Sequence, residues 1–230
     1  MFKELGKRII TSILLFLFTI LCIFTNFFIP ALMIVSLVVF IEISNMIYRI
    51  NRNVNNWKNV VFYIIALFYI IFIFVPSASS LHLEDPVFFL YILSVCICSD
   101  IGGYIIGKTI AGRKLIKISP NKTISGSVGS FCFSILPLLL FYDSNPSKYS
   151  YSINNFLLCL EISLVCQLGD LFISYLKRKA KVKDTGRILP GHGGVLDRID
   201  GIIFAISFVF IYLNGFGEYV EIWKTAFSRI

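Results

Sequence analysis

Seven long apolar stretches divide this chain of 230 residues and constrain its fold more than any other feature. A helix that crosses a membrane needs about 20 mostly apolar residues, because the hydrocarbon layer is about 30 Å thick and a helix rises about 1.5 Å per residue. The stretches that reach or approach this length are Ile9–Asn26, Ala31–Tyr48, Val60–Val75, Val87–Gly107, Gly126–Tyr142, Ile153–Leu176 and Gly201–Gly215. We therefore predict an all-α, polytopic membrane protein with about seven transmembrane helices.

The composition argues against a soluble domain. Hydrophobic residues make up 57% of the chain and charged residues only 15%, and the 23 Phe residues outnumber the 21 Lys and Arg residues. A soluble protein of this size needs more charge to cover its surface. The six Cys residues lie inside apolar runs, without a CxxC pair or a neighbouring His, which argues against a disulfide framework or a zinc site. The first stretch follows three basic residues but has no convincing cleavage site, so we expect a retained helix.

The placement of charge predicts the orientation of the helices. Cytoplasmic loops collect Lys and Arg, and an N-terminus on the cytoplasmic side places 18 of the 21 basic residues there. These residues lie in segments 1–8, 49–59, 108–125 and 177–200. The net charge of +8 then arises mainly from the loops at 108–125 and 177–200. We expect about three N-terminal transmembrane helices in residues 1–85, and a C-terminal membrane region that carries both of these loops in residues 86–230.

Acidic residues in and beside the later apolar stretches are the first sign of function. A carboxylate inside a membrane is costly, so it indicates a functional site or a paired partner. With this orientation, Asp100, Asp170 and the pair Asp197 and Asp200 lie on three helices, at one level near the cytoplasmic surface. The sequence leaves Glu42 and Glu161 open between a structural partner and a functional role.

The loop at 177–200 combines three features that favour phosphate and metal binding. Its seven basic side chains can neutralise phosphate groups, and Gly191, Gly193 and Gly194 permit the backbone to expose amides to an anion. Asp197 and Asp200 are three residues apart and so share one helical face. Carboxylates of this kind suit Mg²⁺ held jointly with substrate phosphates.

The loop at 108–125 carries a second, weaker pattern. Ser119, Lys122 and Thr123 surround a turn fixed by Pro120, and they could hold another phosphate group. An ordinary turn before a membrane helix is the alternative.

Five short motifs in these regions resemble those of the phosphatidate cytidylyltransferases, also called CDP-diacylglycerol synthases. They are Asp100–Gly107 (DIGGYIIG), Ser119–Gly126 (SPNKTISG), Ser174–Arg178 (SYLKR), Pro190–Gly194 (PGHGG) and Leu196–Asp200 (LDRID), together with Lys183 and Asp184. The resemblance covers less than half of the chain, from about Asp100 to Gly201, and its last part is highly specific.

The resemblance implies a Mg²⁺-dependent enzyme, with the possibility of a second cation, that converts CTP and phosphatidic acid into CDP-diacylglycerol and pyrophosphate. Asp170, Asp197 and Asp200 would be the metal-binding and catalytic acids, and His192 would be a further catalytic residue. The substrate-binding residues would be Asp100, Ser119, Lys122, Thr123, Ser174, Lys177, Arg178, Lys183, Gly193, Gly194 and Arg198. The partners would be these two substrates and membrane lipid, with a homodimer implied and no nucleic acid expected.

Two positions depart from the family pattern, and two other functions stay open. Ser125 stands where the family usually has an acid or amide, and Ile173 stands where it usually has Glu. One alternative is a CTP-dependent transferase with another lipid acceptor. The other is a transporter whose intramembrane acids carry protons or cations, which predicts a polar path across the whole membrane.

Overall fold

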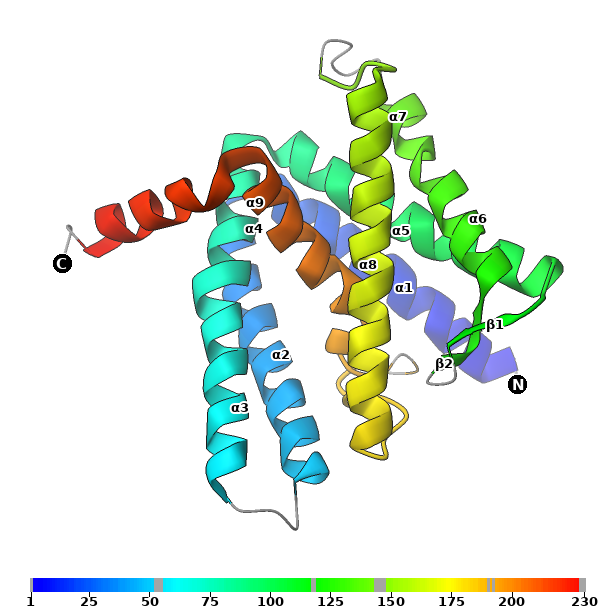
Figure 1. Cartoon of the computed structure of the whole chain (residues 1–230), viewed down its shortest axis with the longest axis horizontal. Coiled ribbons are helices and arrows are strands. Elements are labelled where there is room, and N and C mark those ends of the chain that lie inside the picture. The colour runs from blue at the N-terminus through cyan, green and yellow to red at the C-terminus, as the bar shows by residue number, and fades with distance from the viewer. Residues whose placement is uncertain are drawn as a thin grey trace. The chain divides into compact units, whose positions relative to one another are not determined.

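The computed structural model describes residues 2–51, 56–116, 119–142, 148–189, 191 and 193–227, most of them in helices (Figure 1). In the described chain, five helical segments are long and apolar enough to cross a membrane. They are Phe28–Ile50, Asn59–Glu84, Pro86–Thr109, Ile124–Phe141 and Ile153–Lys179, and a shorter apolar helix covers Thr11–Ile23. The helical class and the membrane character are confirmed, whereas the count of seven spans stays a prediction.

The chain folds into two compact units. The first unit contains Met1–Pro86 and Leu176–Asp200, and the second contains Val87–Tyr175 and Gly201–Ile230. The helices Ile153–Lys179 and Leu196–Phe227 each have residues in both units, and the loop that joins these two helices belongs to the first unit. The expected division into residues 1–85 and a catalytic region 86–230 concerns function and stays a prediction.

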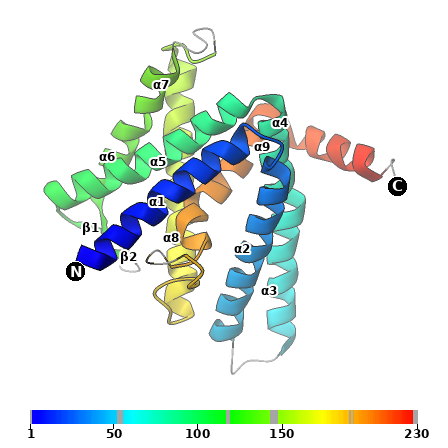
Figure 2. The same cartoon turned by 180° about the vertical axis from the view of Figure 1, so that it is seen from behind.

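The first unit is built from the N-terminal helices. They are α1 (Phe2–Ile23), α2 (Phe28–Ile50), α3 (Asn56–Phe68), the π-helix η1 (Tyr69–Phe74) and α4 (Val75–Glu84). Helices α3, η1 and α4 follow one another without a break, and α2 runs beside α3 (Figures 1 and 2). Apolar side chains such as Leu14 (61% exposed) and Ile64 (59% exposed) point outward, as expected for helices that face lipid.

A buried histidine ties α4 to the turn between α1 and α2. The ring of His82 stacks on Phe28 with 3.6 Å between ring centroids, and its Nε2 atom lies 2.8 Å from the carbonyl oxygen of Ile23. This contact satisfies a carbonyl at the end of α1, which has no partner inside its own helix.

The second unit contains the remaining helices and one small sheet. The elements are α5 (Pro86–Thr109), β1 (Lys114–Ile116), β2 (Ser119–Thr123), α6 (Ile124–Ser134), α7 (Leu136–Phe141), α8 (Ile153–Lys179) and α9 (Leu196–Phe227). The last turn of α8 and the first turn of α9 belong to the first unit. Strands β1 and β2 are antiparallel, with Lys114 opposite Thr123 and Ile116 opposite Ser119. Helix α9 bends at Gly215, where φ is 69° (Figure 1).

Glycines allow α5 and α6 to touch through their backbones. A Cβ atom added to Gly129 would lie 2.7 Å from the carbonyl oxygen of Gly102 and 2.5 Å from Cβ of Ile106. Close approach through small residues is a common way for membrane helices to associate. The contact fixes the start of α6, and with it the end of β2, against α5.

A buried chain of hydrogen bonds sets the rotation of α8. The hydroxyls of Ser99 on α5 and Ser163 on α8 are 2.8 Å apart, and Nε2 of Gln167 donates to Ser163 at 3.2 Å. Oε1 of Gln167 in turn accepts a hydrogen bond of 2.5 Å from Ser127 on α6. Asp170 follows Gln167 by three residues and so lies on nearly the same face of α8.

Candidate active site

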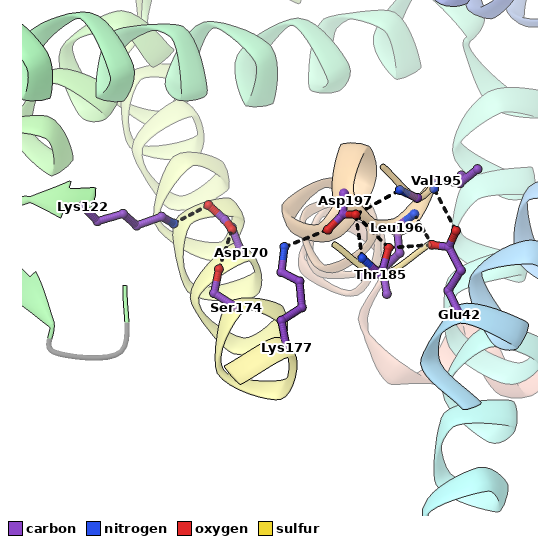
Figure 3. A network of polar contacts seen from close by, with 10 residues as sticks. Glu42, Lys122, Asp170, Ser174, Lys177, Thr185, Val195, Leu196 and Asp197 are labelled. Carbon is purple, nitrogen blue, oxygen red and sulfur yellow. Dashed lines mark hydrogen bonds and ion pairs between the residues drawn. The ribbon is translucent and has the colours of Figure 1, made fainter. Parts of the chain in front are cut away.

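The first cluster of the candidate site lies in the second unit, around Asp170. One oxygen of this carboxylate forms an ion pair with Lys122 of β2, and the other accepts a hydrogen bond of 3.3 Å from Ser174 (Figure 3). The side chains of Lys122 and Asp170 are each 27% exposed. The pair is therefore shielded from bulk water yet open on one side.

Asp100 of α5 belongs to the same cluster. It is close enough to Asp170 and Lys122 to interact with both charges. Two carboxylates thus stand near a single ammonium group, so this part of the cluster carries an excess of negative charge. A divalent cation would relieve their repulsion.

The hairpin β1–β2 presents Lys122 to this cluster. Thr123 caps α6, because its hydroxyl accepts a hydrogen bond of 3.1 Å from the amide of Gly126. The hydroxyl of Ser125 lies 3.0 Å from that of Thr123 and donates to the carbonyl of Ala111. Ser125 therefore has a structural role, because its hydrogen bonds connect the start of α6 to the loop after α5.

The second cluster lies in the first unit, around Asp197 in the first turn of α9. Oδ1 accepts a hydrogen bond of 2.8 Å from Nζ of Lys177. Oδ2 accepts from the amide of Thr185 at 2.7 Å, the amide of Gly194 at 3.0 Å and the hydroxyl of Thr185 at 3.0 Å (Figure 3). The cluster joins the end of α8, the loop and the start of α9.

These donors keep Asp197 ionised. Burial by itself raises the pKa of the carboxyl, but the hydrogen bond from Lys177 and the two amide bonds lower it by more. The pKa of Asp197 therefore lies below its ordinary value. The group is a carboxylate at neutral pH, as a metal ligand must be.

Glu42 of α2 is part of the second cluster, and the sequence motifs did not point to it. It is 2% exposed and accepts hydrogen bonds from the amides of Val195 (3.0 Å) and Leu196 (2.9 Å) and from the hydroxyl of Thr185 (2.8 Å). The one available signal was a single acid in an apolar stretch. The structure shows its partners, because these three hydrogen bonds all come from the loop and the start of α9.

The remaining predicted site residues are charged residues of the segment 177–200, two glycines, and two residues whose side chains are not described. Arg178, Lys183 and Arg198 are exposed on the basic segment, and Asp200 is half-buried near the start of α9. Gly193 has a φ of 86°, which explains a glycine there, and the amide of Gly194 binds Asp197. His192 lies outside the described residues, and Ser119 is placed only by its backbone in β2.

The residues present fit Mg²⁺ that is shared with a substrate. In the described ranges, no group of three or more His, Cys, Asp or Glu residues could enclose a metal by itself. Mg²⁺ is usually held by only one or two carboxylates, with substrate phosphates and water as the other ligands. The neighbouring carboxylates Asp100 and Asp170, and the half-buried Asp197, supply oxygen donors of this kind.

Together, the fold and the two clusters define a class: a polytopic helical membrane protein with lysine-paired carboxylates beside basic loops. Comparison with known proteins narrows the class, because the profile of the cytidylyltransferase family matches residues 3–216. The chain belongs to this family. The match includes the N-terminal helices, for which the motifs gave no information.

Curated relatives agree with this assignment. A phosphatidate cytidylyltransferase of Rickettsia prowazekii (strain Madrid E) is 38% identical over 221 residues, which cover 92% of each chain. That of Rickettsia felis is 38% identical over 168 residues, or 68% of this chain and 74% of the relative. That of Bacillus subtilis (strain 168) is 41% identical over 129 residues, or 54% of this chain and 47% of the relative.

Proposed function

We propose that this protein transfers the cytidylyl group of CTP to phosphatidic acid, giving CDP-diacylglycerol and pyrophosphate. The observation that carries the proposal is the pairing of Asp170 with Lys122 and of Asp197 with Lys177, because Lys122, Lys177 and Asp197 lie in the motifs that resemble the family. Family membership and the names of the relatives support the choice of substrates. Phospholipid synthesis is the process that this product would serve.

The reaction joins two anions. A phosphate oxygen of phosphatidic acid attacks the α-phosphorus of CTP, a new P–O bond forms, and the bond to the β-phosphate breaks. Pyrophosphate leaves with the electron pair. Phosphoryl transfer of this kind needs alignment of the two phosphates and stabilisation of charge more than it needs a strong base.

The basic residues would supply most of that stabilisation. Lys122 and Lys177 each hold a carboxylate in the structure, and each could turn to a phosphate oxygen when substrate is bound. The exposed Arg178, Lys183 and Arg198 would bind the nucleotide and the lipid phosphate. Ser119, Thr123, Ser174, Gly193 and Gly194 would add hydroxyl and amide donors, and His192 would bond a phosphate or move a proton.

We propose Asp170, Asp197 and Asp200 as the residues that would hold Mg²⁺, with a second cation left open, and Asp100 as a substrate-binding residue. When bound, Mg²⁺ would screen the charges of the two substrates and stabilise the departing pyrophosphate. The chain's own part is to keep these carboxylates ionised and oriented. The low pKa of Asp197 supports this assignment.

The orientation and assembly of the protein are part of the proposal. The loops at 108–125 and 177–200 would face the cytoplasm of a bacterial cell, where CTP is available, while the lipid enters from the inner membrane. The excess of Lys and Arg in these loops supports this orientation. We also propose a homodimer in the membrane, which rests only on the resemblance to the synthases.

The proposal is tested with purified protein in lipid vesicles, supplied with phosphatidic acid, labelled CTP and Mg²⁺. We expect CDP-diacylglycerol and pyrophosphate in equal amounts, and no product when Mg²⁺ is chelated. Asp197→Asn should lower kcat by at least about 100-fold, because a charge that orients metal and phosphate is lost. Glu84→Gln, which changes an exposed acid at the end of α4, should leave the rate unchanged.

Three outcomes would contradict the proposal in different ways. Full activity of Asp197→Asn would remove Asp197 from the site. A faster reaction with an isoprenoid or ether-lipid phosphate than with phosphatidic acid would change the acceptor. Ion flux through the vesicles without any turnover of CTP would indicate a transporter instead.

A further inference from the structure

Glu42 connects α2 to the segment that carries Asp197. Its Oε1 atom accepts a hydrogen bond from the amide of Val195, and its Oε2 atom accepts from the amide of Leu196 and the hydroxyl of Thr185. These partners lie 143 to 154 residues away in the sequence. Glu42 thus accepts hydrogen bonds from the loop at Thr185 and from the start of α9, the two parts of the chain that lead to Asp197.

The hydroxyl of Thr185 stands between two carboxylates. It is 2.8 Å from Oε2 of Glu42 and 3.0 Å from Oδ2 of Asp197. A hydroxyl has one proton, so it donates to one carboxylate at a time. The amide of Thr185, however, donates to Asp197 at 2.7 Å in either case. Any shift of Thr185 therefore moves a hydrogen-bond donor of Asp197.

The backbone around Glu42 is shaped to admit its carboxylate. A Cβ atom added to Gly194 would lie 2.5 Å from both Glu42 oxygens, and one added to Gly186 would also collide with Oε1. Both positions are glycine, and a side chain at either one would collide with Oε1, so the loop backbone approaches the carboxylate closely at both. Glu42 is therefore not an incidental contact.

We propose that Glu42 is a positioning residue for the transfer reaction: it holds Thr185 and the start of α9 so that Asp197 keeps one fixed orientation. The amides of Thr185 and Gly194 then occupy Oδ2 of Asp197, the Thr185 hydroxyl is shared between Asp197 and Glu42, and Oδ1 is directed to Lys177. This inference rests on the proposed function, in which Asp197 is one of the reacting-site acids. Glu42 itself touches neither substrate.

The first test is the steady-state kinetics of Glu42→Gln. The amide keeps the shape of the side chain but has a single acceptor oxygen, so at least one of the three donors loses its partner. We expect kcat to fall by about 10- to 100-fold, the range expected when a reacting group is displaced by about an ångström. The KM for CTP should stay within about twofold, because the exposed basic residues are untouched.

Val39→Ala is the matched control for lost stability. Val39 lies on α2 three residues before Glu42, is fully buried, and its removal leaves a cavity in the same helix. We expect Val39→Ala to lower the melting temperature without the loss in kcat. An equal loss of kcat in the two variants at equal melting temperature would show that Glu42 only stabilises the fold and would overturn the proposal.

Thr185 gives a second test, which measures whether Glu42 acts through the hydroxyl of Thr185. Thr185→Val removes the bridging hydroxyl with little change in shape, whereas Thr185→Ser keeps it. If Glu42 acts through this hydroxyl, the loss of kcat in Glu42→Gln with Thr185→Val should be clearly smaller than the product of the two separate losses. Thr185→Ser should recover most of what Thr185→Val loses. Independent, multiplying losses would contradict the coupling.

Hydrogen exchange tests the positioning without any activity. In the unmodified protein, the amides of Val195 and Leu196 should exchange slowly because Glu42 binds them. Glu42→Gln should speed exchange in the segment 184–200 by at least about tenfold and leave α5 and α6 unchanged. Unchanged exchange in that segment would refute the positioning role, even if the enzyme proved to use a different lipid.

Discussion

Lys122 and Lys177, the two half-buried lysines described in the candidate site, each form an ion pair with a carboxylate. The ammonium group of Lys177 is 2.8 Å from Asp197, whose side chain is only 8% exposed, and Lys122 pairs with Asp170 in the same way. A charge in such a place is stable only with its partner, since an unpaired charge is poorly solvated there. Each pair therefore holds opposite charges side by side, at a place where the proposed reaction requires a cation and a phosphate to bind.

Lys177→Met tests this pairing through the pH dependence of stability. Asp197 has a lowered pKa in the folded protein, so its contribution to stability is present above the pKa of the unfolded chain and is lost as the pH falls through the folded pKa. Removing Lys177 takes away the largest of the lowering causes, so the folded pKa rises. We expect a loss of about 1–3 kcal/mol at neutral pH and a smaller acid decline in melting temperature, because the folded pKa of Asp197 then lies closer to its unfolded value.

The matched control for Lys177→Met is Lys183→Met. Lys183 lies in the same basic segment but is exposed, so its removal should leave the melting curve at acid pH unchanged. Identical pH profiles for Lys177→Met and the unmodified protein would show that Lys177 does not hold Asp197 ionised.

At the scale of helices and strands, the contact between α5 and α6 decides where Lys122 lies. The backbones meet at Gly102 and Gly129, and β2 leads directly into α6. A side chain at this contact would push the two helices apart. The hairpin would then move with α6, away from Asp170 and Asp100.

Gly129→Ala tests that contact. The added methyl group would lie 2.5 Å from Ile106 and would force α6 outward, which typically costs about 1–3 kcal/mol. We expect a lower melting temperature and a lower kcat, measured on the same preparation. Val128→Ala is the control, because Val128 is the neighbouring residue on α6 and is 56% exposed; a loss as large as that of Gly129→Ala would argue against a specific contact.

The sequence pattern placed the end of one helix wrongly and missed one hairpin. The apolar run at 60–75 predicts a helix that ends near Val75, but the structure continues through η1 and α4 to Glu84. Pro76 stands in the first turn of α4, where a missing backbone donor is tolerated, so the proline does not end the helix. The hairpin β1–β2 was also missed, because strands of three and five residues have too little periodicity to be recognised.

At the scale of the whole molecule, the charge distribution predicts a sidedness that labelling can measure. Arg187 is exposed in the basic segment 177–200, and Tyr151 is 50% exposed in the segment before α8, which the charge rule places outside the cell. In intact cells, a thiol reagent that cannot cross membranes should label Tyr151→Cys but not Arg187→Cys. Permeabilised cells should label both. Labelling of Arg187→Cys in intact cells would reverse the proposed orientation.

The sequence by itself determined the properties that follow from local composition. Long apolar runs form helices in a membrane, because backbone groups have no water to bind there. Basic residues collect in the loops, because a charged side chain is costly inside the hydrocarbon layer. The motifs also included Lys122, Lys177 and Asp197, and Asp170 stood out as an acid in an apolar stretch; the structure brings these residues together in two separate pairs.

Only the tertiary structure decided which groups satisfy each buried charge. The sequence shows that Glu42 is an acid in an apolar helix, and therefore that it needs a partner. It does not show that the partners are Thr185, Val195 and Leu196, because two of them contribute backbone amides, which every sequence contains. Hydrogen bonds over more than 140 residues depend on how the helices pack, and no local pattern records that packing.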